Sequence, residues 1–160
     1  SSQGSYVIMI NELKVKYYIG EILKTKIGNS HGVFIKAKPI FLMAIINCIE
    51  SKHLSANEIL LDDDILKDEY YGLFKTLQPD VKPSPYLLPY FHLSSESYYS
   101  IFWTGEPFKP HPKAHSPSER YLRLNSTHSY LDGALWGLLQ DEEARSFIKQ
   151  QIVNFYFKAR

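Results

Sequence analysis

The stretch KPIFLMAIINCIE, residues 38–50, is apolar on nearly every side of a helix, so it predicts a helix buried at the centre of the fold. Proline favours the first helical position, so we expect this helix to begin at Pro39 and to end near Ser51. A helix N-terminus carries a partial positive charge and unpaired backbone N–H groups, and Lys36 and Lys38 stand beside this one. The sequence therefore predicts an anion site at the start of the buried helix.

Amphipathic helices are expected on both sides of this buried helix. Residues 10–26 predict a helix whose apolar face comprises Ile10, Leu13, Tyr17 and Leu23. Another is expected from about Asp62, because three consecutive aspartates suit a helix cap and first turn better than the alternating ligands of a calcium loop. A short helix should follow in residues 132–140. Residues 141–157 predict a final helix with a buried stripe comprising Ala144, Phe147, Ile148, Ile152 and Phe155.

The segment YLLPYFHLSSESYYSIFW, residues 86–103, is rich in aromatic rings and nearly free of charge. Two short apolar runs, YFHL and YYSIFW, flank the polar SSES, a pattern that predicts two antiparallel strands joined by a turn. Alternation along the first strand puts Phe91 and Leu93 toward the core and Tyr90 and His92 on the opposite face.

Together these segments predict an α+β fold, a mainly helical single domain with a small antiparallel β-hairpin or sheet. A chain of 160 residues, 44% hydrophobic and 22% charged, is ordinary for one globular domain. We expect residues 10–160 to form it and residues 1–9 to be a tag or a disordered tail. The longest apolar run, residues 39–46, is too short to span a membrane, so a soluble protein is expected.

Side chains suited to catalysis are few. Cys48, the single cysteine, lies in the buried helix, which predicts an inert core thiol, no disulfide and a reducing, cytoplasmic setting. Of the six histidines only His111 and His115 are closely spaced, in a proline-rich loop where a solvated surface is favoured over a metal site. No phosphate-binding glycine motif is present. We therefore expect no catalytic residue, no metal and no cofactor, and a chain that is not an enzyme.

Basic residues gather in three segments, each next to an aromatic residue or a proline. They are Lys36 with Lys38, the loop with Lys109, His111, Lys113 and His115, and the pair Arg120 and Arg123. Lysine and arginine attract phosphates while rings supply apolar or stacking contacts, a combination used in nucleic-acid interfaces. The net charge of +1 does not decide between this interpretation and a scatter of solvated charges.

Three strings, in this order, carry a family resemblance. They are KPIFLMAIINCIE at residues 38–50, PYFHLSSESYYSI at residues 89–101, and YLRLNSTHSYLDGALWGLLQDEEARSFIKQQIVNFYF at residues 121–157. The ordered set resembles the sulfur-binding domain found with HNH nuclease domains in type IV restriction enzymes that recognise phosphorothioate-modified DNA. The likeness covers roughly residues 10–157.

The resemblance implies a module that grips the backbone of duplex DNA and settles the sulfur in a shallow apolar pocket. Sulfur leaves the phosphate charge in place but accepts hydrogen bonds poorly, so apolar contact must distinguish it. The pocket falls on Pro89, Tyr90 and His92, with an imidazole at His92 where some family members carry alanine. The resemblance also places DNA contacts at Lys38, Arg123 and Asn125, to which the basic segments add Lys36, Lys113 and Arg120.

The expected partner is therefore double-stranded, phosphorothioate-modified DNA, without membrane association. The chain would be the reader part of a restriction endonuclease whose linked nuclease domain lies outside it. The alternative is a protein-interaction module that docks a partner through exposed Tyr90, Tyr98 and Phe102. The DNA hypothesis requires the basic residues to lie on the same side of the molecule as Pro89.

Overall fold

Helix α2 (Ala37–Glu50) forms the centre of the molecule, as its apolar sequence predicts. The structure, a computed structural model, describes the backbone of residues 2–158 and the side chains of residues 4, 9 and 11–158. Every side chain from Ile40 to Ile46 is buried, and Phe41 is fully so. The Phe41 ring meets the rings of Tyr70, Tyr86, Tyr90 and Tyr99 edge-on, at centroid distances of 5.4–6.3 Å. An aromatic cluster around α2 is therefore the core of the fold.

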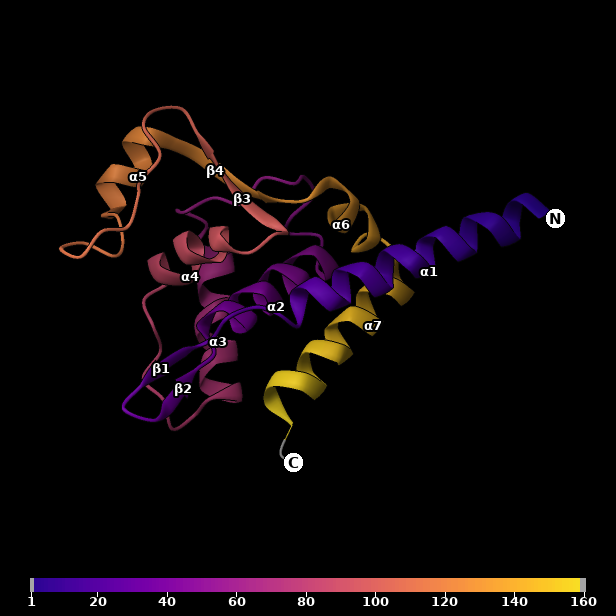
Figure 1. Cartoon of the computed structure of the whole chain (residues 1–160), viewed down its shortest axis with the longest axis horizontal. Helices are drawn as coiled ribbons and strands as arrows, with labels where there is room; N and C mark the ends of the chain where they lie inside the picture. The colour runs from indigo at the N-terminus through magenta and orange to yellow at the C-terminus, as the bar shows by residue number, and fades with distance from the viewer. Residues whose placement is uncertain (1, 159–160) are drawn as a thin grey trace.

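Further helices pack against α2 or against one another. They are α1 (Ser2–Ile22), α3 (Asp64–Leu77), α6 (Gly133–Leu138) and α7 (Glu142–Ile152), the last continued by a wider turn over Val153–Phe157. Helix α3 packs along α2, whereas α7 contacts both α2 and α1 (Figure 1). Asp63 and Asp141 cap α3 and α7, accepting hydrogen bonds from the backbone N–H groups of Leu66 and Ala144.

Two small antiparallel sheets complete the fold, which is the predicted α+β domain. Strands β1 (Gly28–Ser30) and β2 (Val33–Ile35) form a hairpin. Its two-residue turn, His31 and Gly32, has positive φ at both positions, 53° and 85°, as a tight hairpin turn requires. Strands β3 (Tyr99–Trp103) and β4 (Ser126–Leu131) pair across the long connection that holds helix α5 (Glu119–Asn125).

The predicted strand over residues 90–93 is wrong. These residues lie in the short helix α4 (Leu87–His92) and the following 3-10 turn Leu93–Ser95. Pro89 sits in the first turn of α4, where a proline costs no hydrogen bond. The helix buries Tyr90 and Phe91 together against the core, so the alternation expected of a strand does not hold. Strand β3 does form as predicted, but its partner is β4.

Two predicted helix faces are right only in part, because both helices carry apolar residues on more than one side. Among the described side chains of α1, Tyr18 and Ile22 are buried, while Leu13 and Tyr17 are 60% and 58% exposed. The predicted Ile10 side chain lies outside the described residues, and Leu23 is half-buried. In the last helix Ile148, Ile152 and Tyr156 are buried, while Ala144 is half-buried and Phe147 and Phe155 are exposed.

The first half of α1 projects beyond the rest of the molecule (Figure 1). Residues 2–9, which the sequence predicts as a tag or disordered tail, are helical in the structure. Cys48 is buried, and burial, with smaller contributions from Glu69 and Asp63, raises the pKa of its thiol to about 12. Because only the thiolate reacts readily, this is a core residue and not a nucleophile.

Candidate nucleic-acid interface

A cavity of about 260 Å³ lies between the base of the β1–β2 hairpin, the start of α2 and helix α4. Antiparallel pairing of Gly28 with Ile35 brings the chain entering β1 next to the chain leaving β2. Lys26 and Lys38 therefore meet at this cavity. Its walls comprise Lys26, Gly28, Ile35, Ala37, Lys38, Ser84, Leu88, Pro89 and His92.

Lys38 holds its charge in an internal ion pair. Its Nζ donates hydrogen bonds to Glu96 Oε2 at 2.9 Å and to Ser95 Oγ at 3.0 Å. The Lys38 and Glu96 side chains are only 17% and 10% exposed, so solvent screens this pair poorly. The backbone N–H of Lys26 donates to the same Glu96 oxygen at 3.4 Å. An anion entering the cavity would compete with Glu96 for the ammonium group of Lys38.

His92 ties the cavity to the proline-rich loop. Its Nε2 lies 2.7 Å from Ser116 Oγ, in the segment that also carries the exposed Lys113 and His115. Burial lowers the pKa of His92, and electrostatic interactions with Lys38 and His115 lower it further. The imidazole is therefore held neutral near pH 7, bound to the loop and beside the cavity.

This lowered pKa predicts a pH effect on stability. The unfolded chain, with an ordinary histidine pKa of about 6.5, binds the proton more tightly than the folded chain does. The free energy of unfolding should thus fall as the pH drops through the ordinary histidine range toward the lower folded pKa. We expect His92→Gln to flatten this slope in urea titrations at a series of pH values. Equal slopes for both proteins would contradict the assignment to His92.

The structure separates the three predicted pocket residues. Pro89 and His92 line the cavity with Lys38, whereas Tyr90 does not. Tyr90 is 1% exposed, donates from its hydroxyl to the Ile59 carbonyl at 3.2 Å, and accepts at its own carbonyl from Tyr99 Oη at 2.6 Å. Because the residue lies on a helix and not on a strand, its ring turns into the core. The prediction that Tyr90 lines this pocket is corrected accordingly.

Lys36 does not face this cavity, in contrast to the prediction of an anion site formed with Lys38. Its Nζ donates to the Tyr156 carbonyl and lies 5.6 Å from the centre of the Phe157 ring. Its backbone N–H donates to Gln78 Oε1 at 2.8 Å. Lys36 therefore joins the start of α2 to the C-terminal turn of the chain.

Arg123 is also committed within the fold. Its guanidinium donates to both carboxylate oxygens of Asp62, at 2.7 and 3.1 Å, and to Glu119 at 3.1 Å. The hydrogen bond with Asp62, more than any other contact, raises the pKa of Arg123 and lowers that of Asp62. Asp62 and Glu119 thus neutralise the positive charge of Arg123, which would otherwise be available to a DNA phosphate. Arg123, Asp62 and Tyr90 line a separate cavity of about 220 Å³.

The remaining predicted contacts differ in their surroundings. Asn125 is held within the fold, because its backbone carbonyl accepts hydrogen bonds from the N–H groups of Thr104 and Gly105 and its side-chain amide donates to the Tyr121 carbonyl. Arg120 and Lys113 are exposed. Among the described residues neither of them forms an ion pair. Their charges remain open to a ligand.

Sequence reasoning missed Lys26 and Ser84 as cavity residues. Lys26 could have been found from the turn at His31 and Gly32. A two-residue turn fixes which residues of the two strands pair, and therefore which residues meet at the base of the hairpin. No comparable local pattern points to Ser84, which reaches the cavity through the connection between α3 and α4.

Over residues 2–158 no group of three or more His, Cys, Asp or Glu side chains is placed to hold a metal ion. No helix within that range combines the length and the hydrophobicity needed to cross a membrane. Comparison with protein-family models and with curated proteins found no match to this chain.

Proposed function

We propose that this chain binds double-stranded DNA and seats one backbone phosphate, the sulfur-bearing one in phosphorothioate-modified DNA, in the cavity beside Pro89 and His92. The observation that carries the proposal is the composition of this cavity. Ile35, Leu88 and Pro89 give it an apolar wall, and Lys26 and Lys38 are among the residues that line it.

Such a wall suits a phosphorothioate better than a plain phosphate. Sulfur is larger and softer than oxygen and accepts hydrogen bonds poorly, so it gains from apolar contact where an oxygen would lose its hydration. The cavity has a volume of about 260 Å³ with the His92 side chain present in its wall. That volume is several times the roughly 30 Å³ that one water molecule occupies in the liquid, which leaves room for a phosphate group.

The exposed basic loop would extend the interface. The contact between His92 and Ser116 brings this loop to the cavity, and Lys113 and His115 belong to it. Side chains of this kind attract the DNA backbone without reading its sequence. In this proposal the chain is a cytoplasmic reader module without catalytic residues, and cleavage belongs to a linked nuclease domain.

Glu96 should then weaken DNA binding, because its carboxylate lies where it neutralises Lys38 and repels a phosphate. Glu96→Gln keeps the shape of the side chain and an oxygen that can accept from Lys38 Nζ, but removes the negative charge. We expect affinity for duplex DNA to rise about three- to tenfold, and more at low salt than at high salt. Fluorescence anisotropy with a labelled duplex measures the change.

Glu119→Gln is the matched control for this experiment. It removes a carboxylate from Arg123 on α5, and Glu119 is not among the residues that line the cavity. An equal gain in both variants would mean that overall charge, and not Glu96, sets the affinity. A loss of affinity in Glu96→Gln would contradict the proposed role of the cavity.

For the alternative, a protein-interaction module, one of the three aromatic residues predicted to dock a partner is exposed. Tyr90 and Tyr98 are buried and cannot dock a partner. Phe102 is 49% exposed and stacks on His128 with a centroid distance of 5.0 Å on the outer face of the β3–β4 sheet. Phe102→Ala separates the two functions, because it should leave DNA affinity unchanged and remove binding of any partner at this face.

The proposal is tested first by the dependence of DNA binding on salt. Affinity for an unmodified duplex should fall linearly with salt on logarithmic axes, with a slope of about 0.9 for each phosphate that the protein neutralises. Absence of binding at low salt, to either a plain or a phosphorothioate duplex, would overturn it.

A further inference from the structure

The β1–β2 hairpin continues one wall of the candidate site outward. Gly28 and Ile35 pair across the base of the hairpin, and both line the cavity beside Pro89. A Cβ atom at Gly28 would lie 3.6 Å from the Cβ of Ile35, so these two positions face the same side of the hairpin. Side chains alternate along a strand, so the next cross-strand pair on that side is Ser30 with Val33. This pair extends the cavity wall toward the turn.

The outer part of this face is open and its backbone is fixed. Both residues of the outer pair are exposed, Val33 by 50%. The Asn29 side chain holds the turn, because its Oδ1 accepts from the Gly32 N–H at 2.9 Å. Gln78 holds the free edge of β2, since its Nε2 donates to the Phe34 carbonyl at 3.0 Å. The hairpin therefore presents a preorganised surface next to the cavity.

The charge of the hairpin suits duplex DNA. Residues 28–35 include no carboxylate, and Lys26 and Lys38 lie at the base of the hairpin. Lys26 forms no ion pair among the residues that the structure describes. In Figure 1 the hairpin lies on one side of α4 and the proline-rich loop on the other. A duplex with a phosphate in the cavity would therefore meet the hairpin next to that phosphate.

The dimensions of the hairpin match the major groove. Each strand has three residues, so at about 3.3 Å per residue the face is about 10 Å long. This length equals about three base-pair steps of about 3.4 Å. The major groove, about 12 Å wide, admits a two-stranded β-ribbon. A serine hydroxyl can donate to or accept from a base edge, and an apolar side chain such as Val33 can contact the thymine methyl group.

We propose that the face of the β1–β2 hairpin formed by Ser30 and Val33 lies in the major groove and distinguishes about three base pairs on one side of the bound phosphate. This role rests on the proposed function, because the cavity fixes where the phosphate lies. The lysines of the cavity attract any duplex, whereas the hairpin contacts base edges and makes binding depend on DNA sequence.

Anisotropy titrations with a set of duplexes test this role. The duplexes carry one phosphorothioate and differ only in the three base pairs on either side of it. For the wild-type chain the best and worst sequences should differ about tenfold or more in affinity, with the preference confined to one side. Ser30→Ala/Val33→Ala should reduce this difference to about threefold or less. The salt slope should stay unchanged, because no lysine is removed.

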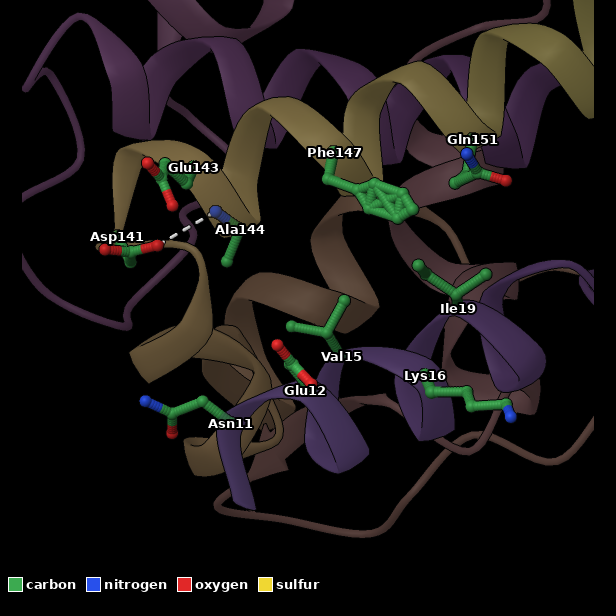
Figure 2. A pocket seen from close by; sticks show the side chains of 10 residues that line it. All are labelled: Asn11, Glu12, Val15, Lys16, Ile19, Asp141, Glu143, Ala144, Phe147 and Gln151. Atoms are coloured by element: carbon green, nitrogen blue, oxygen red, sulfur yellow. Dashed lines mark hydrogen bonds between the residues drawn. The ribbon is translucent and has the colours of Figure 1, made fainter. Parts of the chain in front are cut away.

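Two variants are matched controls. Phe34→Ala truncates the next residue of the same strand, which is 54% exposed but points to the opposite face of the hairpin. Phe147→Ala truncates a ring that is 47% exposed in the groove between α1 and α7 (Figure 2). That groove, with a volume of about 720 Å³, shares no residue with the candidate site. Both variants should keep the sequence preference of the wild type.

The outcomes separate this role from the proposed function. If the wild-type chain bound every sequence within about threefold and kept its salt slope, the hairpin would not contact the bases, while the proposed function would stand. An unchanged preference in Ser30→Ala/Val33→Ala would overturn the role as well. So would an equal loss in Phe34→Ala, since the loss would then reflect the stability of the hairpin. Absence of binding to every duplex would overturn the proposed function and this role together.

Discussion

Phe41→Ala is expected to lower the free energy of unfolding by about 3–5 kcal/mol, the usual cost of removing a fully buried phenylalanine. Phe41 is 0% exposed on the central helix. Its ring meets Tyr86 at a centroid distance of 5.4 Å and Tyr99 at 6.0 Å, so alanine would leave a cavity lined by aromatic edges. Urea denaturation followed by circular dichroism measures the loss.

Phe102→Ala serves as the control for this experiment, because that ring is 49% exposed on the outer face of the β3–β4 sheet. Substitutions at exposed positions change stability by about 0.5 kcal/mol or less. If Phe41→Ala cost no more than Phe102→Ala, the aromatic cluster around α2 would not be the core that stabilises this fold.

The double variant Lys26→Gln/Lys38→Gln is expected to weaken binding to duplex DNA about ten- to a hundredfold, since a charge-assisted contact contributes about 1.5–3 kcal/mol and Lys38 must first leave Glu96. The slope of log affinity against log salt should decrease by about two, because two phosphate contacts are lost. Anisotropy titrations at several salt concentrations give both quantities, and thermal melting shows that the variant remains folded.

Lys36→Gln is the matched control for the double variant. It removes a lysine from the same segment, but one whose ammonium group is bound to the Tyr156 carbonyl. We expect its salt slope to equal that of the wild type. A similar loss in Lys36→Gln, or an unchanged slope in the double variant, would move the DNA interface away from the cavity.

The central helix could be predicted from sequence because its apolar residues cover every side and leave no choice of face. Residues 90–93 could not be assigned so simply, since four residues of alternating character are compatible with a strand or with a short helix. The choice of helix depends on packing against α2, which lies about 50 residues earlier in the chain. In α1 and α7 more than one side is apolar, so the pattern did not determine which side faces the core.

The candidate site was predicted in part. Lys38 lies about 50 residues before Pro89 and His92 in the sequence, and the three residues do line one cavity. Arg123 and Lys36 were predicted to contact DNA. In the fold Arg123 is bound to Asp62, 61 residues away, and Lys36 is bound to the Tyr156 carbonyl, 120 residues away. Such pairing arises only from the tertiary fold, and a local pattern of basic residues does not contain it. The same is true of Glu96, which pairs with Lys38 across 58 residues.

The most direct test of the central claim is a titration of this chain against two matched DNA duplexes, one plain and one with a single phosphorothioate of defined stereochemistry, at several salt concentrations. We predict tighter binding of one sulfur stereoisomer over the plain duplex at every salt concentration, because the apolar wall around Pro89 acts independently of charge. Equal affinity for the plain duplex and for both stereoisomers at every salt concentration would contradict sulfur recognition by this cavity.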